Sequence, residues 1–163
     1  MRVELKDVLA PQMIRLGVQV SDWRQAVTEA GRLLVSGGIV TPGYVEAMIR
    51  AVETLGPYIV IAPGIAMPHA RPKDGACRTG MALIRLDIPV AFGHNANDPV
   101  DLVIPLAAVD HDAHVMAMAQ LVERLGDPGI LLRIRQAATP GEVWRALTDK
   151  QAEQSAMSPG IRK

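Results

Sequence analysis

The apolar pattern of this chain changes near residue 57, and the change limits the folds that the chain can adopt. Before that point, residues 20–38 and 41–56 carry apolar side chains at the spacing of one helix face. Ser21 and Thr41 begin these stretches and are the expected N-caps, because their hydroxyls can accept a hydrogen bond from an unpaired backbone N–H. This part of the chain therefore predicts two consecutive amphipathic helices.

Beyond residue 57 the apolar runs become short and rich in β-branched residues, which is typical of buried strands. Three such runs cover residues 57–64, 79–93 and 100–109. Pro105 interrupts the third run, and we expect an edge or a bulge there because proline cannot donate to a ladder. Helical patterns return at residues 111–126, 128–137 and 139–149, with Asp110 or Asp112 capping the first. Helices mixed with buried strands predict an α/β fold, in which a mixed central β-sheet is flanked by α-helices.

The length of 163 residues suits a single domain, and 49% hydrophobic with 21% charged residues indicates a globular chain. We expect the domain to occupy residues 1–149 and residues 150–163 to form a polar, flexible C-terminal tail. No apolar run approaches the roughly 18 residues that span a bilayer, and the N-terminus does not resemble a signal peptide. These features predict a cytoplasmic protein without membrane insertion.

The composition argues against several kinds of partner and site. Seventeen basic residues balance 17 acidic ones and aromatic residues make up 3%, so we expect no nucleic-acid partner. The single cysteine, Cys77, excludes an internal disulfide and a multi-cysteine metal site. The sequence also lacks a GxxxxGKS or GxxxxGKT phosphate loop and a GxGxxG dinucleotide turn, so we expect no nucleotide site and no cofactor.

The stretch IAPGIAMPHARP, residues 61–72, places a histidine in a constrained turn. Pro68 and Pro72 restrict the backbone on either side of His69, which suits a preformed site. An imidazole titrates near neutral pH and can act as nucleophile, acid, base or metal ligand. Arg71 offers a planar guanidinium that matches the oxygens of a phosphate. The alternative from the residues alone is a surface turn with a solvated histidine.

The other three histidines also follow predicted strands. His94 lies in a turn after the second run, while His111 and His114 lie at the start of the helix after the third. Because the ligands of open α/β sheets gather at strand ends, we expect all four histidines to meet on one rim. His114 is the expected second imidazole of the site, His111 a neighbour of the helix cap, and His94 a minor candidate. A zinc site built from three of these histidines is the alternative, although no carboxylate in a standard motif is placed to act as a catalytic base.

Four stretches of the chain resemble a single protein family: GPYIVIAPGIAMPHARP, PVAFGHNANDPVDLVIPLAAVD, DAHVMAMAQLVERL and GYVEAMI. They are similar to the enzyme IIA component of the bacterial phosphoenolpyruvate-dependent sugar phosphotransferase system, of the mannitol/fructose type. The similarity spans residues 5–148, and GIAMPHARP is specific to the superfamily. GPYIVIAPG and FGHNANDPVD favour its ascorbate-specific branch. The resemblance implies the family fold, a mixed sheet flanked by helices, which agrees with the pattern of the residues.

The resemblance implies a phosphoryl relay through the histidine of the PHA turn. In the family this histidine accepts the group from phosphorylated HPr and passes it to a cysteine of the cognate enzyme IIB, and the sugar is phosphorylated as it crosses the membrane enzyme IIC. Carried over by position, His69 is the phosphorylated residue and His114 stabilises the phosphoryl group, with Arg71 as a further phosphate contact. Mannitol-type members also have an arginine near the end of the preceding helix. Arg50 lies close to that position but at a different spacing, so its role stays open.

Partner proteins that dock in turn imply an accessible rim around His69. We expect this rim to be apolar and to include Ile65 and Met67, with burial of both in the core as the alternative. A second hypothesis for the whole chain is a regulatory binding module, since nitrogen-type relatives share the histidine turn and signal through their phosphorylation state. A third hypothesis is a zinc hydrolase that uses the histidine cluster.

Overall fold

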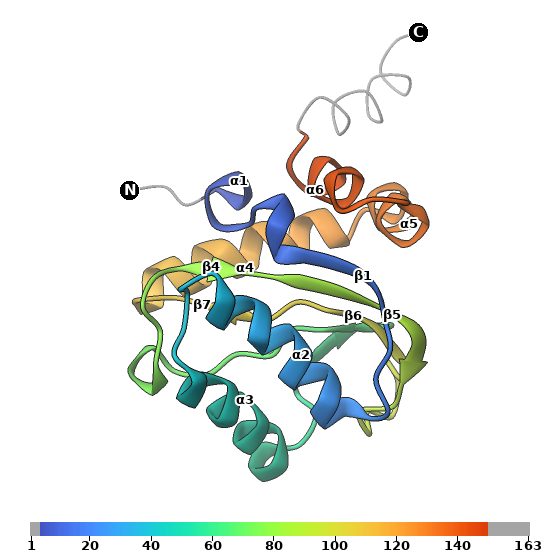
Figure 1. Cartoon of the computed structure of the whole chain (residues 1–163). Helices are drawn as coiled ribbons and strands as arrows, with labels where there is room; N and C mark the ends of the chain where they lie inside the picture. The colour runs from blue at the N-terminus through green and yellow to red at the C-terminus, as the bar shows by residue number, and fades with distance from the viewer. Residues whose placement is uncertain (1–3, 150–163) are drawn as a thin grey trace, which may run out of the picture.

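A mixed β-sheet separates two groups of helices in the computed structural model, which describes residues 4–149 (Figure 1). The helices are α1 (Leu5–Val8), α2 (Trp23–Ser36), α3 (Pro42–Leu55), α4 (His111–Leu125), α5 (Pro128–Gln136) and α6 (Pro140–Thr148), with short 3-10 turns η1 (Pro11–Met13) and η2 (Pro72–Asp74). The strands are β1 (Ile14–Val18), β2 (Val60–Ala62), β3 (Ile65–Ala66), β4 (Gly80–Met81), β5 (Leu83–Val90), β6 (Val100–Val103) and β7 (Leu106–Ala107). The predicted tail of residues 150–163 lies outside the described residues.

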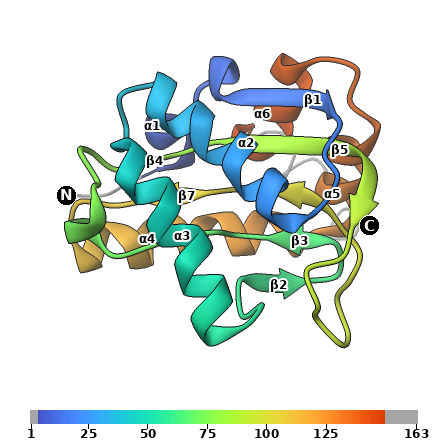
Figure 2. The ribbon, with the colours of Figure 1, turned by 60° about the horizontal axis from the view of Figure 1, so that its bottom comes forward.

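The main sheet has the strand order β1-β5-β6-β3-β2. β1 runs parallel to β5 and β3 parallel to β6, whereas β5 is antiparallel to β6 and β2 is antiparallel to β3. β4 and β7 form a separate two-stranded sheet. Figure 2 shows β1 and β2 at the two edges of the main sheet. The mixed pattern confirms the predicted α/β fold with a mixed central sheet.

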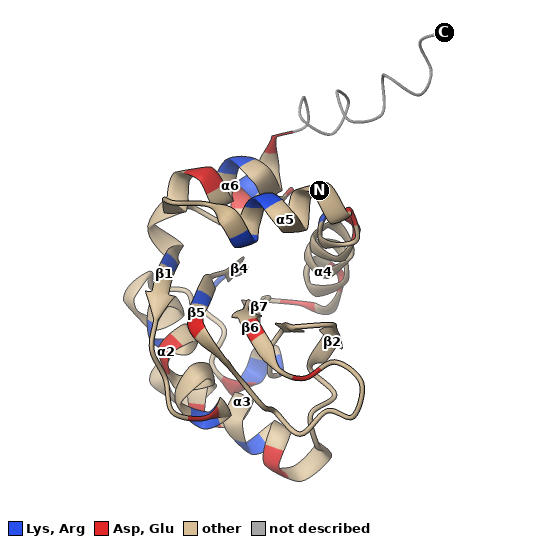
Figure 3. Cartoon of the chain, turned by 90° about the vertical axis from the view of Figure 1, so that its right-hand side faces the viewer, with Lys and Arg blue, Asp and Glu red and all other residues tan. Residues whose placement is uncertain are grey.

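Each face of the sheet carries its own aliphatic core. On one face α2 and α3 bury side chains such as Val27, Leu34 and Met48, while α1, α4, α5 and α6 cover the other face with residues such as Leu121 and Ile134 (Figure 1). Along the ribbon in Figure 3, segments with Lys or Arg alternate with segments with Asp or Glu. Within residues 4–149, none of the helices has the length and apolar character needed to cross a membrane. With both faces covered, the ends of the strands are left to carry the loops that reach solvent.

The helices begin close to their predicted positions, but one cap differs. Asp22, and not Ser21, is the N-cap of α2, where its carboxylate accepts a bond from the backbone N–H three residues on at 2.9 Å. The prediction of Ser21 was wrong because the helix begins one residue later, where a carboxylate is equally suited to the role. Thr41 is the N-cap of α3 but its side chain makes no capping hydrogen bond in the described structure. Asp110, one of the two predicted residues, caps α4, whereas Asp112 lies in its first turn.

The apolar runs contain more breaks than their pattern predicted. Residues 57–64 hold only β2, and the chain turns at Gly64 into β3, a strand that was not predicted. Pro105 lies between β6 and β7, and β6 is central in its sheet, so the expected edge or bulge at this proline was wrong. The chain instead leaves the main sheet here and resumes in the second sheet, since a proline cannot continue the ladder. β1 was also not predicted, because Arg15 and Gly17 break its apolar alternation.

Candidate active site

A tight hairpin delivers His69 to one end of the sheet. Gly64, at the turn, has φ +78°, and a Cβ added there would meet the guanidinium of Arg135, so the position requires glycine. β3 follows this turn and runs parallel to β6. His69 lies just beyond the carboxyl end of β3 and pairs with Leu106 of β7 through an isolated parallel bridge. The histidine therefore sits at a strand end, as predicted.

The imidazole of His69 is fixed in one tautomer by its own turn. Its Nδ1 lies 2.8 Å from the carbonyl oxygen of Met67. Because a carbonyl oxygen only accepts hydrogen bonds, Nδ1 carries the hydrogen and Nε2 keeps the lone pair. Tyr58 meets the His69 ring edge-on, with ring centroids 5.6 Å apart, and the His114 ring lies at 5.2 Å. These contacts hold the ring while Nε2 is free to act as a nucleophile.

His114 lies in the first turn of α4, at a helix N-terminus where the Asp110 carboxylate accepts the backbone N–H of Ala113. Burial lowers the pKa of His114, and the neighbouring His69 and His111 lower it further. His114 is therefore neutral at pH 7, with one ring N–H available to donate. A neutral donor at a helix N-terminus suits the stabilisation of an anionic group on His69.

The two imidazoles open onto a cavity of about 630 Å³ between α3, the His69 turn and the start of α4. The polar and aromatic side chains on its wall include Arg50, Tyr58, Arg71 and His111. At the start of η2 the Asp74 carboxylate accepts the backbone N–H of Arg71 at 3.0 Å, and the Asp74 N–H donates to the Arg71 carbonyl at 2.9 Å. The Arg71 Nε lies 3.5 Å from the same carboxylate. The Arg71 side chain is still 71% exposed, so its guanidinium stands at the mouth of the cavity. The cavity thus offers two guanidinium groups to an anion.

His94 does not join the other histidines. It lies in the loop that leads from β5 into β6, at the start of β6. His69 instead follows the end of β3, which runs parallel to β6, so the two residues are at opposite ends of the sheet. The Nδ1 of His94 accepts hydrogen bonds from the backbone N–H groups of Ala96 and Asn97. The expectation that all four histidines share one rim was wrong for His94, because β6 reverses the direction of β5. His94 closes its own loop.

The predicted apolar rim also differs from the structure. Ile65 is 1% exposed and Met67 is fully buried, and both belong to the core between the sheet and α4. The prediction was wrong for both residues, since their alternate positions along β3 and its extension face this core. The exposed apolar residues beside the cavity are Leu55, which is 70% exposed, and Tyr58, which is 44% exposed.

The zinc alternative has no geometric support in the described part of the chain. Across residues 4–149 no group of three or more His, Cys, Asp or Glu side chains is arranged to hold a metal ion. His69, His111 and His114 share the cavity wall, but their arrangement is not that of a metal-ligand set. Cys77 is exposed and lies outside the cavity wall.

Comparison with known proteins agrees with this geometry. The family model for the phosphoenolpyruvate-dependent sugar phosphotransferase system, EIIA 2, matches residues 7–150. The chain belongs to this family. An ascorbate-specific PTS system EIIA component from Escherichia coli is 42% identical over 143 residues, which cover 86% of this chain and 93% of that protein. The resemblance to the ascorbate-specific branch is therefore confirmed.

Solved structures share the fold of this EIIA family member. The mannitol-specific cryptic phosphotransferase enzyme IIA CmtB from Escherichia coli has a TM-score of 0.80 at 33% identity, covering 91% of this chain and 99% of that chain. The enzyme IIAMTL from Escherichia coli, solved in a complex with phosphorylated enzyme IIBMTL, has a TM-score of 0.76 at 29% identity, covering 86% and 98% of the two chains. The predicted fold thus agrees with that of solved phosphotransferase components.

Two cavity residues of this EIIA family member, Leu55 and Tyr58, were not identified as site residues from the sequence, and the role of Arg50 was left open. Arg50 lines the cavity from α3, and its spacing from His69 along the chain did not reveal this. Tyr58 contacts the His69 ring from the start of the β2 hairpin, and Leu55 stands at the end of α3. The sequence pattern placed Leu55 on the apolar face of the helix, but it is the last residue of α3 and is exposed. The available signal was that Leu55 and Tyr58 flank the Gly-Pro pair that ends the helix.

Proposed function

We propose that this chain is a phosphocarrier in which His69 accepts a phosphoryl group from phosphorylated HPr and passes it to a cysteine of the cognate enzyme IIB. The observation that best supports this is the bond between His69 Nδ1 and the Met67 carbonyl, which leaves Nε2 as a free nucleophile on an open cavity. We infer ascorbate as the sugar, because the relative from Escherichia coli is named ascorbate-specific. The chain works in the cytoplasm and serves the membrane enzyme IIC indirectly.

The two transfer steps need neither a nucleotide nor another cofactor, because the phosphoryl group arrives on a protein. In the first step the Nε2 lone pair of His69 attacks phosphorus, the P–N bond to the HPr imidazole breaks, and its electron pair stays on the HPr nitrogen. The positive charge on the phosphorylated His69 ring is shared with the Met67 carbonyl through Nδ1–H. In the second step the enzyme IIB thiolate attacks phosphorus, and the electron pair of the broken P–N bond returns to Nε2.

The neighbours of His69 stabilise the charge of the transferring group. His114 donates its ring N–H to one phosphoryl oxygen, and the N-terminus of α4 adds a positive partial charge beside it. Arg50 and Arg71 approach from the other walls of the cavity. Phosphoryl transfer depends on such positioning and charge stabilisation rather than on covalent machinery.

HPr and enzyme IIB dock in turn on the face that carries the cavity. The exposed side chains of Leu55 and Tyr58 give this face an apolar contact beside the nucleophile. The mannitol enzyme IIA that was solved with phosphorylated enzyme IIB supports docking of this kind for the fold. We assign the relay to a domain of residues 1–149 and give the remaining 150–163 no part in it.

A reconstituted relay tests the proposal. Purified enzyme I, HPr and labelled phosphoenolpyruvate should label this chain, and adding the cognate enzyme IIB should discharge the label to its cysteine. His69→Ala should accept none, whereas His94→Ala should be labelled at the rate of the unmodified chain, because His94 lies at the other end of the sheet. Normal labelling of His69→Ala would contradict the assignment of His69 as the phosphoryl acceptor. Labelling that enzyme IIB cannot discharge would favour the regulatory role over the relay.

A further inference from the structure

Tyr44 places its hydroxyl beside His69, although the residue belongs to α3 and is only 1% exposed. The hydroxyl accepts a hydrogen bond from the backbone N–H of Ala70 at 3.0 Å. It donates toward the carbonyl oxygen of Leu106, which lies 2.8 Å away, with the Ala70 carbonyl as a longer alternative at 3.1 Å. Every polar partner of this buried hydroxyl therefore belongs to the His69 turn or to the strand beside it.

The hydroxyl occupies a particular place in the β-ladder. His69 and Leu106 form a parallel bridge, and the Leu106 N–H donates to the Pro68 carbonyl at 2.9 Å. In a regular parallel ladder the next bond would run from the Ala70 N–H straight to the Leu106 carbonyl. Here the Tyr44 oxygen stands between these two groups. The peptide groups on both sides of His69 are thus anchored to β7, one directly and the other through Tyr44.

We propose that Tyr44 is a positioning residue for phosphoryl transfer, whose hydroxyl sets the spacing between the His69 turn and β7 and so directs Nε2 into the cavity. The proposal rests on the phosphocarrier role of His69. Its physical basis is that transfer requires reacting atoms within about 3–3.5 Å in the correct direction, so a small shift of the turn lowers the rate. No partner needs to touch Tyr44, because the residue is buried.

The same hydroxyl ties the turn to α3, which carries Arg50. The N-terminus of α3 is itself joined to the loop after His69, since the Thr41 N–H donates to the Gly75 carbonyl at 2.9 Å. Gly75 leaves no room there, because a Cβ would collide with the Thr41 hydroxyl. α3 and the histidine turn are therefore linked at two points, through the Tyr44 hydroxyl and through Thr41. Burial raises the pKa of Tyr44 to about 12, so the O–H donor persists throughout the physiological pH range.

Tyr44→Phe removes the hydroxyl but keeps the ring that fills the core. Without the oxygen, the Ala70 N–H and the Leu106 carbonyl can bond to each other only if the turn moves toward β7. We expect the kcat for acceptance from phosphorylated HPr to fall about 10- to 100-fold, with an unchanged KM for HPr, since the docking face is untouched. In nitrogen-15 NMR spectra of labelled histidine, His69 should lose the signature of its fixed Nδ1–H tautomer.

Trp144→Phe is the matched control. Its indole N–H donates to the Leu9 carbonyl at 2.6 Å in the other core, so the change also removes one donor to a backbone carbonyl. This control should keep the normal kcat and the normal His69 spectrum. A normal kcat and spectrum in Tyr44→Phe, or the same loss of kcat in Trp144→Phe at equal stability, would overturn the proposal. If the unmodified chain accepts no phosphoryl group, the relay fails, yet the His69 spectrum of Tyr44→Phe still tests the positioning.

Discussion

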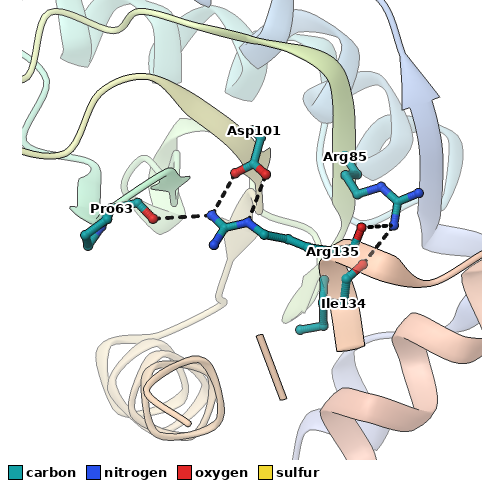
Figure 4. Close-up of polar contacts among 5 residues, drawn as sticks. All are labelled: Pro63, Arg85, Asp101, Ile134 and Arg135. Atoms are coloured by element: carbon teal, nitrogen blue, oxygen red, sulfur yellow. Dashed lines mark hydrogen bonds and ion pairs between the residues drawn. The ribbon is translucent and has the colours of Figure 1, made fainter. Parts of the chain in front are cut away.

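The end of the sheet that carries His69 and the end that carries His94 hold similar kinds of side chain in their loops. At the His94 end these groups are paired: the Asp98 carboxylate accepts three backbone N–H groups, and Arg135 makes a two-point ion pair with Asp101 and also donates to the Pro63 carbonyl (Figure 4). At the His69 end, no hydrogen bond or ion pair within residues 4–149 engages the side chains of Arg50, His111 or His114.

This difference separates polar groups that hold the fold from those that remain available for a ligand. Polar groups that are not exposed are normally satisfied in folded proteins, so the half-buried His114, which lines a cavity without a hydrogen-bond partner in the described residues, is a candidate for binding or chemistry. Arg85 holds the fold in the same way, because its guanidinium donates to the carbonyls of Ile134 and Arg135 at the end of α5 (Figure 4). It also donates to the carbonyl of Ala137. Residue type alone does not distinguish the two ends of the sheet. Arg71 is paired with Asp74 at the His69 end, but Arg50, His111 and His114 line the cavity without such partners in the described residues.

The strongest test of the comparison removes the second imidazole of the cavity. His114→Ala should slow transfer from phosphorylated His69 to enzyme IIB by about 100-fold, because a donor to the phosphoryl oxygens is lost. The rate at which His69 accepts the phosphoryl group from HPr should fall less than the rate of transfer to enzyme IIB. Rapid-quench measurements of both steps, with His94→Ala as the control, check this. Equal loss in both steps would argue against stabilisation of the phosphoryl group by His114.

At the opposite end, Asp101→Ala should lower stability without lowering the activity of the folded chain. The change leaves the half-buried guanidinium of Arg135 without its carboxylate, which we expect to lower the free energy of unfolding by about 1–3 kcal/mol. Urea unfolding measures this, and the double variant Asp101→Ala with Arg135→Ala should lose less than the sum of the single changes. A loss of phosphoryl acceptance in the folded Asp101→Ala variant would break the distinction between the two ends.

A finer test compares the two arginines of the cavity. Arg50→Ala should lower kcat for phosphoryl acceptance by about tenfold, less than the loss of a buried oxyanion donor. Arg71→Ala should have a smaller effect, since Asp74 already shares its charge. Arg50→Lys keeps a positive charge and should restore part of the rate. A larger loss in Arg71→Ala than in Arg50→Ala would reverse the assignment.

The smallest expected effect is a change in the pKa of His114. The pKa of His114 should lie below that of a free imidazole, and His111→Ala should raise it slightly by removing a neighbouring cation. Because folded His114 binds its proton less readily than the unfolded chain does, stability rises with pH between the two pKa values and protonation of His114 opposes folding. Histidine NMR titration measures the pKa directly. A raised pKa would contradict the neutral donor that we assign to His114.

The local sequence pattern was sufficient to predict much of the fold. The helical spacing before residue 57 and the capping chemistry at Asp110 are properties of short segments, and both are present in the structure. The two-residue strand β3 could not be predicted, because Gly64 and Pro63 make its run look like a single strand followed by a loop. Ile65 and Met67 were misplaced for the same reason, since the face that a side chain occupies depends on the strand to which it belongs.

By itself, the sequence determined that the chain is an α/β protein of the EIIA 2 family and that His69 lies in a constrained turn, because helix periodicity, turn prolines and motif residues are contiguous in the chain. Only the tertiary structure decided which other residues share the cavity with His69. Arg50 and His114 meet His69 there while His94 does not, since these contacts depend on strand direction and on how α3 and α4 pack against the sheet. The role that we infer for Tyr44 likewise depends on a hydroxyl that inserts between two segments distant in the chain.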